Sequence, residues 1–311
     1  MSDKSIDLVY ILGTGSKWNN IELRLSLRSV EKKLTGYRNI YIVGENPGFL
    51  SQKVIHLPFP DMLSSKNADG NMALKILHAC ANPELSDDFL FMNDDFIINK
   101  PVNTLKFPLY HKGDMKERSD EYWKAQPYRY RLRRTFEALL ERGLPTMQYD
   151  YHAPMIMNKH KFIEVMAQYD FQSDIGLTFR SLYGNTLKLP AEHLDNQKIT
   201  FYRGYNLAEI RTRVVPPAFI GYNDHGLCDA FKFWLFKSFP DKSSFEKNND
   251  VFDRMYDIML WEKGGKKYED GVAIYTKYFP HTNFTRLLAV HRNQGLEIKL
   301  NYRLNQVINA L

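Results

Sequence analysis

Short apolar runs and amphipathic segments alternate over the first hundred residues of the chain. Four apolar runs bounded by polar residues or glycine, as buried strands are, lie at residues 6–12, 39–43, 54–57 and 89–92. After the first run, Leu23, Leu27 and Val30 recur at helical spacing, and a second helix is expected over residues 69–80. Strands and helices in this order predict βαβ units and therefore a largely parallel α/β sheet.

The fourth apolar run leads directly into Asn93, Asp94 and Asp95, after which Phe96 resumes the apolar pattern. Two adjacent carboxylates are therefore expected at a strand end, where ligands of open α/β sheets bind. Carboxylate oxygens are ligands that Mg²⁺ or Mn²⁺ prefers, often together with substrate phosphates. The alternative interpretation is a turn in which Asn93 and Asp94 hydrogen-bond with their own backbone.

A glycine-containing turn, formed by Gly13, Thr14, Gly15 and Ser16, follows the first run. Because glycine has no side chain, such a turn lets a phosphate or a nucleotide approach the backbone closely. The remaining glycines of the Rossmann fingerprint are missing, so the turn alone does not define a dinucleotide site.

Basic and aromatic residues are interleaved, without any acid, over residues 122–134. This composition favours a phosphate-rich or sugar-rich ligand. The alternative is the exposed start of a helix, because the helical pattern continues to about residue 140. The residues expected to contact such a ligand are Tyr128, Arg129, Tyr130, Arg131 and Arg133.

Three further polar residues stand out only weakly in the sequence. His152 precedes a helix expected near residues 159–168, and Arg180 lies on a helix that closes at Gly184. Taken alone, His152 is typical of a structural histidine, and Arg180 is typical of an exposed arginine. Asp224 ends another apolar run together with Asn223, which repeats the Asn-Asp pair at residues 93–94.

Composition narrows the classes of protein and of partner. The 311 residues are 44% hydrophobic and 14% aromatic, which is enough for one large domain or two modest ones. A net charge of +6 favours anionic partners such as nucleotides, phosphorylated glycans, nucleic acid or membrane surfaces. Cys80 and Cys228 lie far apart and indicate neither a disulfide framework nor a zinc site. With no transmembrane-length apolar run and no secretory signal pattern, we expect a cytoplasmic protein.

Four blocks of sequence carry a family resemblance when they are taken in order. They are residues 22–32 with 38–43; residues 85–102 around Asn93-Asp94-Asp95-Phe96; His152-Ala153-Pro154 with Arg180; and Tyr222-Asn223-Asp224 with 239–240 and 244–247. Together they resemble the Stealth family of sugar-phosphate transferases, which includes bacterial capsule polymerases and the lysosomal-targeting N-acetylglucosamine phosphotransferase. The chain departs from the family in its first strand, where Gly13-Thr14-Gly15 occurs near the place of a Trp-Val-Asp-Gly segment.

The resemblance implies a GT-A-like Rossmannoid catalytic domain over residues 1–249, with a mostly helical C-terminal extension over residues 250–311. The catalytic residues that it implies are Asp94, Asp95, His152, Arg180 and Asp224, with Mg²⁺ or Mn²⁺ on Asp94, Asp95 and Asp224. In such chemistry His152 would be the general base, Arg180 would hold phosphate charge, and Asp224 would bind metal or orient His152. The nucleotide-sugar donor of such an enzyme is expected to contact Gly13, Thr14, Gly15, Ser16, Arg24, Arg28 and Asn93, and its acceptor the five residues named above in the basic segment.

The function that follows is transfer of a sugar 1-phosphate from a nucleotide sugar to a hydroxyl of a glycan. The first alternative is a glycosyltransferase on the same scaffold that moves the sugar alone, with a hydroxymethylated base in DNA as one acceptor that the basic charge suits. The second alternative, from a different class, is a catalytically inactive module that binds a glycan or nucleic acid.

Overall fold

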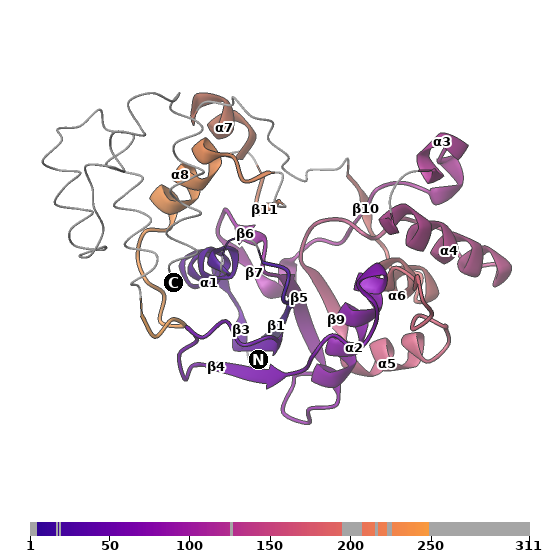
Figure 1. Cartoon of the computed structure of the whole chain (residues 1–311), viewed down its shortest axis with the longest axis horizontal. Helices are drawn as coiled ribbons and strands as arrows, with labels where there is room; N and C mark the ends of the chain where they lie inside the picture. Colours follow the sequence, from indigo (N-terminus) through magenta and orange to yellow (C-terminus); the bar gives the residue numbers. More distant parts are fainter. Residues whose placement is uncertain are drawn as a thin grey trace, which may run out of the picture.

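A five-stranded sheet forms the centre of the molecule (Figure 1). The computed structural model describes residues 5–16, 18, 20–124, 127–194, 207–214, 217–222 and 226–248, so Asp224 and the extension expected over residues 250–311 lie outside the described residues. The sheet has the strand order β4-β3-β1-β5-β9. Its strands are β1 (Ile6–Leu12), β3 (Tyr37–Gly44), β4 (Val54–Pro58), β5 (Asp88–Asn93) and β9 (Met155–Asn158). The first four are parallel and β9 is antiparallel, which confirms the predicted α/β class.

The direction of chain winding reverses beside β1. From β1 the chain adds β3 and β4 on one side, and then returns to place β5 on the other side. Ile11 in β1 pairs with Asn93 in β5, so the turn after β1 and the carboxylates after β5 leave the sheet at one edge. Ligands of open α/β sheets bind at such a reversal point, beyond the carboxyl ends of the strands.

The predicted helices cover the sheet on both faces because alternate side chains of each strand point to opposite sides. Leu8 and Tyr10 belong to the core that contains Leu23 and Leu27 of α1 (Ile21–Lys33). Val9 belongs to the core on the other face, with residues of α2, α4, α5 and α6. These helices span Ala68–Cys80, Pro127–Glu141, Lys159–Met166 and Phe179–Thr186, respectively.

Shorter elements complete the part of the chain that the structure describes. The short strands pair as β2 (Leu34–Thr35) with β7 (Val102–Asn103), β8 (Tyr110–His111) with β10 (Glu192–His193), and β6 (Phe96–Ile98) with β11 (Phe219–Gly221). The remaining helices are η1 (Ser65–Asn67), η2 (Thr104–Lys106), η3 (Met115–Glu117), α3 (Asp120–Trp123), α7 (Leu207–Val214) and α8 (Asp229–Ser238). Across these described segments, no helix combines the length and the apolar character needed to cross a membrane.

A buried ion-pair cluster holds the segment after α8 against α1. Arg24 Nη1 and Arg28 Nε lie 2.7 and 2.8 Å from the carboxylate of Glu246, whose side chain is fully buried. Burial alone would raise the pKa of Glu246, but the hydrogen bonds and charge of Arg28, supported by Ser243 and Arg24, lower it overall. The two arginines were expected to bind the donor. The structure corrects that expectation, because both are buried against Glu246 and neither lines the cavity at the end of β1.

Candidate active site

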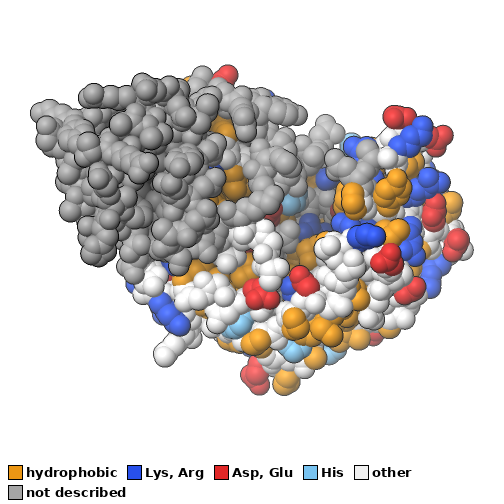
Figure 2. All heavy atoms as spheres, in the orientation of Figure 1, with side chains coloured by type: hydrophobic (Ala, Val, Ile, Leu, Met, Phe, Trp, Pro, Cys, Tyr) orange, Lys and Arg blue, Asp and Glu red, His pale blue; other side chains and the backbone are white. Residues whose placement is uncertain are grey.

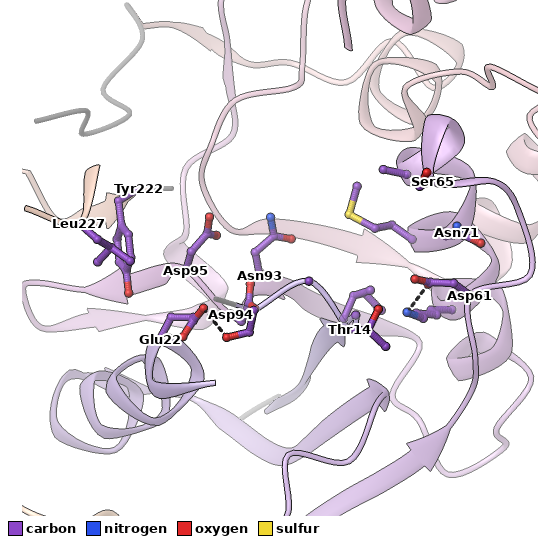
Figure 3. A pocket seen from close by; sticks show the side chains of 17 residues that line it. Thr14, Glu22, Asp61, Ser65, Asn71, Asn93, Asp94, Asp95, Tyr222 and Leu227 are labelled. Carbon is purple, nitrogen blue, oxygen red and sulfur yellow. Dashed lines mark hydrogen bonds and ion pairs between the residues drawn. The ribbon is translucent and has the colours of Figure 1, made fainter. Parts of the chain in front are cut away.

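A cavity of about 580 Å³ opens at the carboxyl edge of the sheet, at the reversal point between β1 and β5 (Figure 3). The four residues of the turn after β1, from Gly13 to Ser16, line one part of it. Asn93, Asp94 and Asp95 from the end of β5 line another part. Among the described residues, its charged side chains are four carboxylates and one lysine, namely Glu22, Asp61, Asp94, Asp95 and Lys75. We call this cavity the acidic pocket.

The carboxylate of Asp94 lies in an environment that disfavours its charge. Burial, together with the negative charges of Asp95 and Glu22, raises the pKa of Asp94 well above its usual range. Glu22 lies on the first turn of α1, and its Oε1 accepts a hydrogen bond of 2.8 Å from Ser16 Oγ. Figure 3 shows Asp94 and Glu22 side by side in the pocket. A cation or a cationic part of a ligand would relieve the repulsion between these carboxylates.

Lys75 ties α2 to the end of β1. Its buried Nζ donates to the carbonyl oxygen of Leu12 at 2.9 Å and lies 2.6 Å from Asp61 Oδ1. The lysine thereby satisfies the last carbonyl of β1, immediately before Gly13, and fixes the start of the turn. Among the described lining residues, negative charge is in excess, because Lys75 is the one lysine and its charge is paired with Asp61.

His152 and Asp95 form a hydrogen-bonded pair at the edge of the acidic pocket. His152 Nε2 lies 2.9 Å from Asp95 Oδ2 and 2.7 Å from the carbonyl oxygen of Tyr222. Both partners are acceptors, so the hydrogen-bond network assigns the proton to Nε2. In the neutral ring, Nδ1 is then the nitrogen that can accept a proton. The ring packs edge-on against Phe96, with centroids 5.0 Å apart.

The β6–β11 pair brings the residues around His152 together. Its antiparallel register sets Gly221 opposite Phe96, immediately after Asp95. A Cβ atom at Gly221 would lie 2.3 Å from the carbonyl oxygen of His152 and 2.5 Å from its Cδ2. Only glycine therefore allows this close approach of β11 to the histidine.

A second cavity, of about 650 Å³, lies next to the first and shares Met72 and Asn93 with it. His152 lines this second cavity, whereas Asp95 lines the first, so the hydrogen-bonded pair spans the boundary. We call the second cavity the basic pocket, since its charged lining, among the residues that the structure describes, is five lysines or arginines and two aspartates. These are Lys112, Arg118, Arg129, Arg131, Arg180, Asp69 and Asp150.

Arg180 is buried and lines the basic pocket, contrary to the exposed position typical of an isolated arginine. Its guanidinium donates to the carbonyl oxygen of Tyr151 and lies 3.5 Å from Asn93 Oδ1. The group also stacks 4.8 Å from the ring centroid of Phe91. Burial lowers the pKa of Arg180 from its usual range, and nearby carboxylates, first Asp150 and then Asp69, oppose that shift.

The basic segment at residues 122–134 divides between the pocket and the exposed helix surface. Arg131 is buried and pairs with Asp69 at 2.7 Å, and Tyr128 and Arg129 also line the basic pocket. Burial raises the pKa of Asp69 to about 6, although Arg131 opposes the shift. Arg133 instead forms an exposed ion pair with Glu137.

Neither Arg133 nor Tyr130, whose side chain is exposed, lines either pocket. The expectation that these two contact the acceptor is therefore revised. Helix α4 does begin here, as the alternative interpretation expected, and it turns only one of its faces toward the basic pocket. Binding of a phosphate-rich or sugar-rich ligand by this segment stays a prediction.

Sequence reasoning missed several residues that line the two pockets. Glu22 and Lys75 lie on amphipathic helices, where a charged residue is typical of the exposed face, yet both are buried. Asp69, Asp150 and Arg118 also line the basic pocket and belong to no recognised motif. The doublet Asp94-Asp95 had a detectable signal because it directly follows a buried strand.

The carboxylates of the acidic pocket are the side chains that could bind a divalent cation. Within the described ranges, no group of three or more His, Cys, Asp or Glu side chains is arranged to hold a metal ion. Asp95 Oδ1 is buried and has no hydrogen-bond partner among the described residues, and Asp94 lies beside two other carboxylates. Magnesium often takes only one or two protein carboxylates together with substrate phosphates. Asp94 and Asp95 fit such a partial ligand set.

Comparisons with known proteins concern the fold. No family model matches the chain, and no curated protein matches it. Among solved structures, the chain is similar to a glycosyltransferase involved in the glycosylation of the major capsid of PBCV-1, with 13% identity over 70% of this chain and 92% of that one and a TM-score of 0.37. It is also similar to an active-site mutant of LgtC, with 11% identity over 77% of this chain and 98% of that one and a TM-score of 0.41. The Stealth resemblance stays a prediction.

Proposed function

We propose that this protein is a transferase that uses a nucleotide-sugar donor and a hydroxyl acceptor. The observation that carries the proposal is the pair of adjoining pockets of opposite charge, with the Asp95–His152 hydrogen bond across their boundary. A reaction between two bound molecules requires two adjoining subsites and a reactive group between them.

The donor belongs in the acidic pocket. Its position at the sheet reversal point and the backbone of the Gly13–Ser16 turn suit a nucleotide. Its carboxylates would repel a diphosphate that carried no counter-ion, so the donor would bind with a divalent cation. Asp94 and Asp95 would hold that cation, which would supply charge neutralisation at the diphosphate.

His152 is the general base in this proposal. Asp95 and the carbonyl of Tyr222 keep its proton on Nε2, so Nδ1 takes the proton of the acceptor hydroxyl. The carboxylate of Asp95 stabilises the imidazolium that forms. Arg180 is fixed beside Asn93, at the wall that the two pockets share, where a guanidinium neutralises charge on a transferring phosphoryl group.

Within this class, we propose sugar 1-phosphate transfer, with Arg180 as the observation that favours it. The acceptor oxygen would attack the phosphorus that bears the sugar, and a nucleoside monophosphate would leave. The alternative is attack at the anomeric carbon, with a nucleoside diphosphate as the leaving group. In both reactions the hydroxyl proton passes to His152, so the two differ in product and not in the base.

The test is to incubate the full-length protein with a panel of nucleotide sugars, a mixture of sugar acceptors and Mg²⁺ or Mn²⁺. Release of a nucleoside monophosphate supports sugar 1-phosphate transfer, and release of a nucleoside diphosphate supports glycosyl transfer. His152→Gln is expected to lower either product by a factor of about 10²–10⁴. If no donor in the panel is consumed, or if His152→Gln is as active as the wild type, the proposal is wrong.

A further inference from the structure

Two arginines beside a single tyrosine ring form a distinct part of the basic pocket. The guanidinium carbons of Arg118 and Arg129 lie 5.1 and 4.6 Å from the ring centroid of Tyr122. Tyr122 belongs to α3 and Arg129 to α4, which Figure 1 shows next to each other at one end of the molecule. Figure 2 shows Lys and Arg side chains at the same end of the visible face, interspersed with acidic ones.

Protein groups neutralise neither of these two charges within the described part of the chain. Arg131 is paired with Asp69 and Arg133 with Glu137, but Arg118 and Arg129 form no ion pair with any described residue. The only described acceptor for Arg129 is the carbonyl oxygen of Tyr122, at 2.9 Å. The Tyr122 ring attracts both guanidinium groups but carries no net charge, so the repulsion between the two cations is left for a bound anion to offset.

The contacts of Arg118 orient it without filling its hydrogen-bonding capacity. Its Nη2 donates to the carbonyl of Lys112 and to Gln148 Oε1, and Gln148 in turn donates to the Tyr128 hydroxyl at 3.1 Å. Its Nε is buried and has no hydrogen-bond partner among the described residues, and no described residue accepts from its Nη1. A guanidinium held in this way presents fixed donors, which suits the planar or tetrahedral oxygens of a carboxylate or a phosphate.

We propose that Arg118 and Arg129 bind a phosphate or carboxylate group of the acceptor, so that the acceptor is an anionic sugar or glycan. This rests on the proposed function, which gives the acidic pocket to the donor. The same cavity reaches His152, so one molecule can place its anion at the two arginines and its hydroxyl at the base. The shared chemistry is a compact anionic group, for which a sugar phosphate and a uronic acid are the two sources.

Binding is measured on the full-length protein without donor, by ligand-observed NMR titration with glucose 6-phosphate, glucuronate and glucose. We expect at least one of the two anionic sugars to bind at least about tenfold more tightly than glucose. Tighter binding of glucose 6-phosphate alone identifies phosphate as the group, and tighter binding of both identifies a general anion site. Equal affinity for the three sugars would overturn the proposal.

Variants separate the site from general effects of charge. Arg118→Gln and Arg129→Gln are each expected to weaken binding of the anionic sugar about tenfold or more, with Arg129→Lys intermediate. The matched control is Arg142→Gln, because Arg142 also stacks on a tyrosine, 4.4 Å from the ring centroid of Tyr169, and lines neither pocket. An equal loss in Arg142→Gln would contradict the proposal. Thermal unfolding checks that each variant is folded.

Two competition experiments test the other ligand classes. If a single-stranded DNA oligonucleotide displaces glucose 6-phosphate at far lower concentration and depends on the same arginines, nucleic acid is the ligand and the proposal is wrong. If UDP with Mg²⁺ displaces it, the basic pocket holds the donor and the proposal is again wrong. If the proposed function is wrong but this inference is right, the result is different: arginine-dependent binding of anionic sugars persists while no nucleotide sugar is consumed.

Discussion

His152 Nε2 lies 2.9 Å from Asp95 Oδ2, although 57 positions separate the two residues along the chain. Asp95 follows the end of β5, and His152 precedes β9, the antiparallel neighbour of β5 in the sheet. The pairing of β5 with β9 therefore brings the two side chains together at the boundary between the two pockets. Their hydrogen bond also fixes which ring nitrogen of His152 carries the proton.

The first prediction is that Asp95 and His152 act as one unit. We expect Asp95→Asn to lower transfer by a factor of about 10²–10⁴, because the neutral amide cannot stabilise the imidazolium. The double variant Asp95→Asn/His152→Gln should then lose less than the product of the two single losses, and what it loses beyond His152→Gln reports the cation that Asp95 would also hold. Steady-state rates of the four proteins give this comparison. Losses that multiply would mean that Asp95 acts independently of the histidine.

Gly221 provides a test of the position of His152. In Gly221→Ala the new Cβ would collide with the carbonyl oxygen and ring of His152, at 2.3 and 2.5 Å. Displacement of a catalytic group by about 1 Å costs on the order of 10²-fold in rate, so transfer should fall by about that factor. Donor affinity, measured by calorimetry, should change little because Gly221 lies outside the acidic pocket. Wild-type transfer in this variant would contradict the assigned role of His152.

The third prediction concerns the cluster of Arg24, Arg28 and Glu246. Glu246→Gln removes the carboxylate that these buried guanidinium groups share and should lower the free energy of unfolding by about 3–5 kcal/mol. The matched control, Glu137→Gln, breaks an exposed pair with Arg133 and should cost at most about 1 kcal/mol. Urea denaturation measures both. A similar small loss in the two variants would show that the buried cluster contributes little.

Asp69 gives the unfolding free energy a pH dependence of known sign. Its pKa rises from an ordinary value near 3.8 to about 6 in the folded protein, chiefly by burial, with Asp150 adding to the shift and Arg131 and Arg180 opposing it. Between these values the folded state holds a proton that the unfolded state has lost. Stability should therefore decrease as the pH rises from about 4 to about 6 and stay level, for this group, above that.

Asp69→Asn removes the titrating carboxyl group. Denaturation at several pH values measures the free energy of unfolding of the variant and of the wild type. The variant should lose less stability than the wild type between pH 4 and 6, whatever the constant cost of losing the ion pair with Arg131. Parallel stability curves for the two proteins would mean that the carboxyl of Asp69 titrates at its ordinary pKa.

The last prediction addresses the divalent cation. Asp94→Asn should abolish most binding of Mn²⁺, measured by electron paramagnetic resonance, and should weaken nucleotide-sugar binding in the presence of Mn²⁺. The control is Asp61→Asn in the same pocket, because the Asp61 carboxylate is already paired with Lys75. Equal loss of Mn²⁺ in the two variants would point to a general effect of pocket charge, and no loss in Asp94→Asn would remove Asp94 as a ligand.

The sequence by itself determined the four parallel strands of the central sheet and the edge at which Asp94 and Asp95 lie, but it did not indicate the antiparallel strand β9. Strand and helix patterns depend on neighbours two to four positions away, so β1, α1, β5 and the carboxylates after β5 could be predicted from local periodicity. The charged residue types of the basic segment were also visible, but not which of them face a ligand. Arg131 and Arg133, two positions apart on one helix, point in different directions, and only the packing of α4 makes the first buried and the second exposed.

Tertiary structure alone decided which distant residues meet. Nothing in the sequence near residues 24, 28 and 246 indicates that the two arginines of α1 pair with a carboxylate about 220 positions away. Likewise, His152 reaches Asp95 only because β9 pairs with β5 and β11 pairs with β6. Such contacts depend on how whole elements pack, and packing energy is summed over many side chains that no short window of sequence contains.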